Sequence, residues 1–171
     1  MNMKRIKFLI YIPVVFILLS LQGTLLEYLK IINVKPNLIL IFVVCAALLN
    51  KQWEGAAVGF LAGLSLDMAS GDVLGFHSLL FMYTGIGIGF ISRYVFKDNF
   101  LIVMLVTFVT SVVYGCAVFF LKVFPIAGDI SMAYPFLRVI IPEAAYSAVV
   151  SVFIYAFMIK LNRKMERLET V

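Results

Sequence analysis

Three ionisable side chains occur close together near the middle of the chain, and they are the first candidates for chemistry. Asp67, Asp72 and His77 lie in the stretch Asp67-Met-Ala-Ser-Gly-Asp-Val-Leu-Gly-Phe-His77. Carboxylate and imidazole groups can bind a metal ion, but the stretch lacks the paired spacing of helical metal sites. We therefore expect no metal here. A partner or ligand contact at the outer face of a membrane stays open as an alternative.

The same stretch fits a sharp turn between two helices. Ser70 or Asp72 can cap the second helix, since short polar side chains accept hydrogen bonds from first-turn N–H groups. Asp67 can accept hydrogen bonds from the turn backbone, while Gly71 and Gly75 allow the reversal. The pattern therefore predicts that Asp67, Asp72 and His77 shape an outer turn.

Arg138 and Glu143 form a second polar pair, at the start of the last apolar run. Glu143 follows Pro142, and a carboxylate in a first turn complements the positive end of the helix dipole. The two residues are close enough in sequence to pair at the outer interface. A proton-coupling carboxylate is the alternative, but it would need a polar partner on another helix.

Glycines recur at four-residue spacing in two neighbouring apolar runs. Gly55, Gly59 and Gly63 share one face of a helix, and Gly85 and Gly89 repeat the spacing on the next. In lipid, small residues let helix backbones approach closely. We expect these five glycines to pack the helices of the bundle, with docking of a partner helix as the alternative.

No arrangement of side chains points to catalysis or to a cofactor. The sequence has one histidine and contains neither a G-x-S-x-G nucleophile motif nor a phosphate-binding glycine loop. Cys45 and Cys116 lie in apolar runs without metal-ligand spacing, so we interpret them as small hydrophobic residues. The prediction is a protein that is not an enzyme.

The composition defines the elements that must position these residues. Of 171 residues, 64% are hydrophobic and only 13% are charged, and the mean hydropathy is +1.09. A soluble enzyme, a disordered chain and a nucleic-acid-binding domain are all excluded, because none could carry so much apolar surface. An integral membrane protein remains.

The apolar runs predict an all-α fold with six transmembrane helices in a single domain, residues 1–171. The first run follows a basic start but lacks a cleavage site, so we interpret it as a retained helix rather than a signal peptide. Residues 55–66 alone are too short to cross the membrane. That helix either continues through Asp67 to Gly71 or stops inside the bilayer. The predicted helices span approximately residues 8–26, 36–50, 55–71, 73–92, 99–121 and 139–159.

The basic residues predict the orientation in the membrane. Six crossings place both termini on one side, with ten of the 14 Lys and Arg residues. The other four, on the opposite side, are Lys30, Lys35, Lys122 and Arg138. Because cytoplasmic loops carry the excess of Lys and Arg, both termini are predicted to be cytoplasmic.

Four segments resemble a known family. They are Lys35-Pro-Asn-Leu-Ile-Leu, Gly59-Phe-Leu-Ala-Gly-Leu-Ser-Leu-Asp67, Ser70-Gly-Asp-Val-Leu-Gly-Phe-His77 and Gly85-Ile-Gly-Ile-Gly89. Together they are similar to the bacterial rod shape-determining protein MreD family over about positions 35–90. Pro36-Asn37 departs from the Pro-Asp pair that is expected in many members.

The resemblance implies a non-catalytic subunit of the cell-elongation machinery in the bacterial cytoplasmic membrane. Implied partners are the single-pass protein MreC and, in a larger complex, RodA, a class B penicillin-binding protein and MreB. The implied fold is similar to the substrate-binding subunits of energy-coupling-factor transporters, so a vitamin-binding transport subunit is the alternative. The first predicted helix, residues 8–26, contains no alanine, and so lacks the A-x-x-x-A docking pattern implied for such subunits.

Overall fold

The computed structural model describes residues 3–28, 34–50, 52–71, 73–93, 99–123, 125 and 136–169, and the described part is all-helical. This confirms the predicted all-α class. Two π-helical turns, η1 and η2, continue α5 and lead into α8, respectively. The elements are α1 (Met3–Tyr28), α2 (Leu38–Leu49), α3 (Gln52–Ser70), α4 (Phe76–Ile91), α5 (Phe100–Val118), η1 (Phe119–Val123), η2 (Phe136–Ile140) and α8 (Ile141–Glu169).

Helix α2 forms the core of the bundle. Its sequence, LILIFVVCAALL, is apolar on every side, and all residues from Leu38 to Leu48 are buried. A helix that is hydrophobic all round is expected to be enclosed by other helices. Here α1, α3, α4, α5 and α8 all contact it.

Apolar stripes on α5 and α8 face outward instead. On α5, large side chains recur every four residues and are half to three-quarters exposed; they are Leu101, Leu105, Val109 and Val113. On α8, Val149, Phe153 and Phe157 repeat this spacing and exposure. Exposed apolar stripes of this length are expected of helices that face lipid.

Two of the described helical segments are long and apolar enough to cross a membrane: Phe100–Val123, with 24 residues, and Phe136–Asn162, with 27. Helix α2, with only 12 residues, extends about 18 Å, less than the hydrocarbon thickness of about 30 Å. In a bilayer, the ends of a helix this short would lie where protein groups must satisfy the backbone.

The helix boundaries differ from the predicted ones at several ends. Helix α2 begins at Leu38, with Asn37 as its N-cap, rather than at position 36. The sequence pattern favours a polar turn over residues 51–54, but α3 already begins at Gln52, with Glu54 favouring the start of the helix. The other end of α3 agrees with the longer of the two expected helices, since α3 continues through Asp67 to Ser70. Finally, α8 extends to Glu169, well beyond the predicted end at Ile159.

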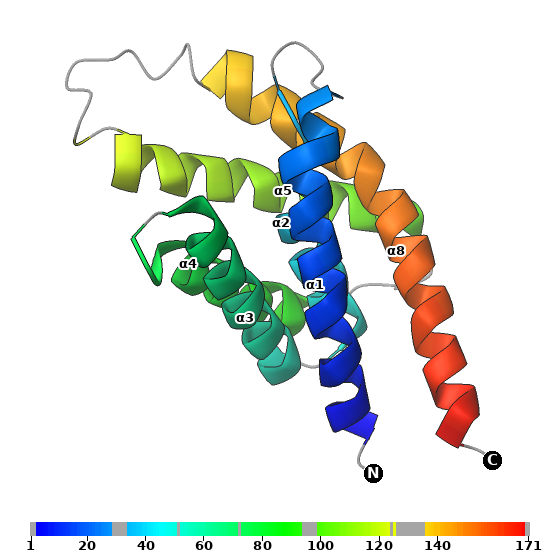
Figure 1. Ribbon diagram of the computed structural model, residues 1–171. Helices are drawn as coiled ribbons and strands as arrows, with labels where there is room; N and C mark the ends of the chain where they lie inside the picture. The colour runs from blue at the N-terminus through cyan, green and yellow to red at the C-terminus, as the bar shows by residue number, and fades with distance from the viewer. Residues whose placement is uncertain are drawn as a thin grey trace.

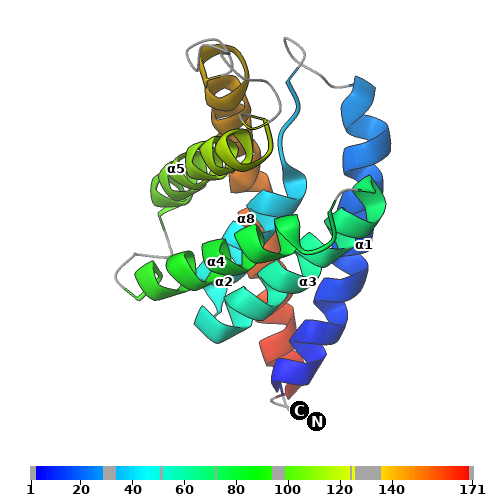
Figure 2. The same ribbon diagram turned by 90° about the vertical axis from the view of Figure 1, so that its left-hand side faces the viewer.

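Helices α3 and α4 form a closely packed hairpin on one side of the molecule, and α5 runs across α8 (Figure 1). The start of α1 and the end of α8 lie at the same end of the bundle in both views (Figures 1 and 2). The opposite end holds the end of α1 and the beginning of α8, and the extended segment before α2 runs from that end into the bundle (Figure 2).

Candidate functional site

The glycines of α3 and α4 lie against each other's helix backbones. A Cβ atom on Gly59 would collide with the carbonyl oxygen of Phe81, and one on Gly85 would collide with the carbonyl oxygen of Gly55. A Cβ on Gly63 would come within 2.5 Å of the Cα atom of Ser78. The two backbones approach this closely only because side chains are absent at the seam.

Gly55 and Gly89 extend this seam towards the other end of the hairpin. A Cβ on Gly89 would collide with the Cα atom of Gln52, and one on Gly55 would come within 2.9 Å of the Cβ of Ala47 on α2. The structure thus brings together all five glycines that the sequence singled out. Their faces are turned towards other helices of this chain, so a partner helix could reach them only by separating α3 from α4.

Asp67 accepts hydrogen bonds from the first turn of the following helix. Its side chain is fully buried, and its carboxylate accepts from the N–H groups of Gly75 at 2.9 Å, His77 at 3.0 Å and Ser78 at 3.2 Å. The hydroxyl of Ser78 donates to it as well, at 2.8 Å. A carboxylate at the positive end of a helix is stabilised both by these donors and by the helix dipole.

The expected cap of α4 by Ser70 is wrong, because Ser70 donates its hydroxyl to the carbonyl oxygen of Leu66 in its own helix. The residue at the N-cap position is Gly75, which has no capping side chain. Gly71 and Gly75 have φ values of +68° and +99°, which favour glycine. Asp67, one helix back, supplies the missing acceptor. Asp72 lies outside the described residues.

His77 connects this turn to α5. Its ring nitrogen Nδ1 lies 2.7 Å from the hydroxyl of Tyr114, and both rings pack against Phe81. Sequence reasoning missed Tyr114, since nothing in its neighbourhood marks it out from the other aromatic residues of an apolar run. Within the described ranges, no group of three His, Cys, Asp or Glu residues is placed to hold a metal ion.

Glu143 lies half-buried in the first turn of α8, where the positive charge of Lys35 acts on it. Arg138 is exposed on η2. The charge of Lys35, which precedes α2, is close enough to act on Glu143, and pairing of Glu143 with Arg138 stays a prediction.

The beginning of α2 carries a second polar cluster, which sequence reasoning missed. The N–H of Leu40 donates to Oδ1 of Asn37 at 3.1 Å, and the N–H of Ile39 donates to Oε1 of Gln22 on α1 at 3.3 Å. The N–H of Asn37 itself donates to the hydroxyl of Ser147 on α8, at 3.2 Å. Asn37 is of a residue type that caps helices, so the sequence contained a sign of its capping role. Nothing in the sequence indicated that Gln22 and Ser147 would accept hydrogen bonds at this position.

Taken together, the apolar lipid-facing stripes, the buried central helix and the internal capping of buried helix ends fit an all-helical membrane protein. The family model described as rod shape-determining protein MreD matches residues 3–165. The chain belongs to this family, and its role is in determining rod shape. Comparisons with curated proteins and with solved structures found no match. The comparisons give the transport alternative no support.

Proposed function

We propose that this protein is a non-catalytic, multi-pass subunit of the bacterial rod complex, in which it docks MreC and helps organise peptidoglycan synthesis. The observation that carries the proposal is the family match over residues 3–165. RodA, a class B penicillin-binding protein and MreB are the further partners that we propose for the larger assembly.

The polar side chains inside the bundle support a structural role. Asp67 and Asn37 both accept hydrogen bonds from backbone N–H groups at the beginning of a helix. A catalytic carboxylate would instead need to face a substrate with a suitable proton donor or acceptor within reach. These buried polar groups hold helices in place, as a scaffold requires.

We further propose six crossings with both termini in the cytoplasm, and a fold like that of the energy-coupling-factor substrate-binding subunits. The position of the α1 start and the α8 end at one end of the bundle supports an even number of crossings. Most of the basic residues belong to the predicted loops and termini of that side, which supports a cytoplasmic location.

The experiment is purification of a tagged copy from native membranes in mild detergent, followed by mass spectrometry of what accompanies it. Recovery of MreC would support the scaffold proposal. Recovery of ATPase subunits together with a transmembrane coupling protein would overturn it in favour of transport.

A pair of glycine variants makes this experiment sharper. Gly59→Leu should separate α3 from α4, because its side chain would meet the backbone of Phe81, and should reduce MreC recovery at equal expression. Gly87→Leu is the matched control, since Gly87 lies exposed on α4 and a Cβ atom added there would have no heavy atom within 4 Å. Unchanged MreC recovery with Gly59→Leu would count against the proposal that an intact hairpin is needed for docking.

A further inference from the structure

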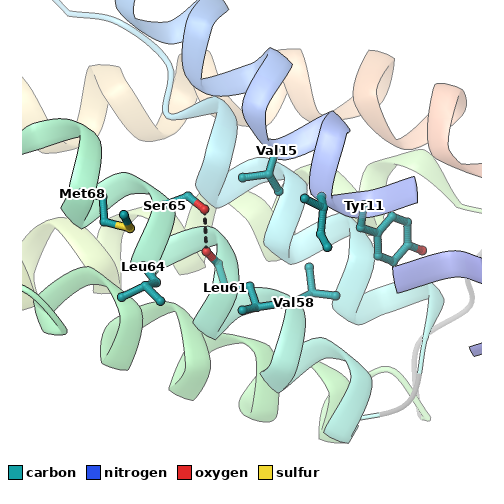
Figure 3. Close-up of a pocket in the computed structure, with 8 residues that line it drawn as sticks. Tyr11, Val15, Val58, Leu61, Leu64, Ser65 and Met68 are labelled. Atoms are coloured by element: carbon teal, nitrogen blue, oxygen red, sulfur yellow. Dashed lines mark hydrogen bonds between the residues drawn. The ribbon is translucent and has the colours of Figure 1, made fainter. Parts of the chain in front are cut away.

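A groove lies between α1 and α3 on the outside of the bundle (Figure 3). Its volume is about 180 Å³. Helix α1 contributes one wall and helix α3 the other, and the lining is mostly apolar. The residues that matter for the argument are Tyr11, Ile12, Val15, Val58, Leu61 and Ser65.

The polar atoms of this lining are already engaged within the protein. The hydroxyl of Ser65 donates to the carbonyl oxygen of Leu61 in its own helix, at 2.9 Å (Figure 3). The hydroxyl of Tyr11 accepts a hydrogen bond from Nδ2 of Asn50 on the far side of the groove wall, at 3.0 Å. A polar ligand such as a vitamin would therefore lose hydration without gaining matched partners.

The groove opens onto the surface that a bilayer would surround. Ile12 and Leu61 are 45% and 37% exposed at its rim. Water would not fill such a site, because a buried water needs two to four polar partners. An empty groove would forfeit dispersion contacts along both walls. Hydrocarbon is the medium that satisfies both conditions.

We propose that this groove binds one acyl chain of a membrane phospholipid, held between α1 and α3. A segment of an unbranched chain fits a cavity of about 180 Å³, whereas a whole helix, about 10–12 Å across with its side chains, does not. The bound chain would complete the packing of α1 against α3, as a buried side chain does in the core of a soluble protein.

Native mass spectrometry of the purified protein tests the proposal, after exchange from phospholipid into a mild detergent. The wild type should retain one phospholipid. Ser65→Phe should lose this phospholipid, because the added ring would occupy the space between α1 and α3 that the chain fills. The matched control is Ser70→Phe, because Ser70 is an exposed serine of the same helix with the same type of local hydrogen bond. It should retain the lipid.

A spectroscopic measurement keeps the test independent of how well Ser65→Phe folds. Trp53 is the only tryptophan, so Leu61→Trp in a Trp53→Phe background reports on the groove alone. In vesicles that contain brominated phosphatidylcholine, tryptophan at position 61 should be quenched at a lower fraction of brominated lipid than tryptophan at Leu105. Leu105 is 65% exposed on α5 and represents the ordinary lipid-facing surface.

Equal quenching curves at positions 61 and 105 would overturn the proposal, as would a wild-type protein that retains no lipid. A third outcome would also overturn it. If Ser65→Phe loses MreC while wild type and variant retain equal lipid, the groove receives a side chain of the partner helix instead.

Discussion

The first turns of α4 and α2 both contain buried backbone N–H groups, and the two helices meet their need for hydrogen-bond acceptors in different ways. At α4, one carboxylate does this work: Asp67 accepts from three backbone N–H groups and one hydroxyl. At α2, the neutral side chains of Asn37, Gln22 and Ser147 each accept one N–H group.

The two arrangements also differ in how far along the chain the acceptor lies. Asp67 is within 11 positions of every donor it serves, so the α3–α4 hairpin is complete in itself. Gln22 and Ser147 lie 17 and 110 positions from their donors. The N–H groups at the beginning of α2 therefore have all their acceptors only when α1 and α8 are both packed against it. We call this meeting point of three helices the junction at α2.

The largest effect should come from Asp67→Ala, which leaves three backbone N–H groups, two of them buried, and the hydroxyl of Ser78 without their shared acceptor. We expect the free energy of unfolding to fall by about 4 kcal/mol, because hydrogen bonds to a charged group are each worth more than neutral ones. Denaturant unfolding in detergent micelles measures this. Ser70→Ala, at an exposed position of the same helix, should change stability by less than about 0.5 kcal/mol. Equal losses for the two variants would contradict the capping role of Asp67.

Next in size is Asn37→Ala, which removes the acceptor of the Leu40 N–H group at the buried start of α2. The expected loss is about 2 kcal/mol, the upper part of the range for helix caps, because the N–H group remains buried. Asn99 caps α5 in the same way but is exposed, so water can replace it. Asn99→Ala should therefore cost about 1 kcal/mol or less in the same unfolding experiment. If Asn99→Ala lowered the unfolding free energy more than Asn37→Ala does, burial of the capped N–H group would not determine the loss.

How far the sequence predicts each region follows from these separations. Asp67, the turn glycines and the five seam glycines lie within one stretch of chain, so their spacing already pointed to an acidic acceptor, a reversal and a close helix pair. The assignment of the cap to Ser70 failed because a local acceptor was assumed, whereas the Ser70 hydroxyl is engaged by its own helix. Asp67, near the end of α3, is the side chain that accepts the hydrogen bonds from the first turn of α4.

The junction at α2 could not be predicted to the same extent. Asn37 is of a residue type that caps helices, although the predicted helix began at Pro36. Gln22 and Ser147 resemble any other polar residue in an apolar run. Their roles depend on which helices pack together, and a hydropathy pattern does not contain that information. The same holds for Tyr114 beside His77, and for Lys35 as the charge that acts on Glu143.

A smaller effect is expected from Ser147→Ala. This change on α8 removes the hydroxyl that accepts a hydrogen bond from the N–H group of Asn37. The hydrogen bond is neutral and 3.2 Å long, so the loss in unfolding free energy should be about 1 kcal/mol. Ser151 is equally buried on the same helix, but its hydroxyl donates to Ala148 within that helix. Because this hydroxyl bonds only within α8, Ser151→Ala should lower the unfolding free energy by less than Ser147→Ala does. If both serine variants behave alike, the contact between α8 and the start of α2 contributes nothing beyond packing.

The smallest effect should come from Tyr114→Phe, which tests whether the first turn of α4 depends on a helix outside its hairpin. The change removes the hydroxyl beside Nδ1 of His77 but keeps the ring that packs against Phe81. Since Asp67 still holds the backbone of the turn, we expect a loss of only about 0.5 kcal/mol. Tyr83→Phe, at an exposed position of α4, is the control for removing a tyrosine hydroxyl. A loss as large as that of Asn37→Ala would mean that α4, like α2, is completed only by distant parts of the chain.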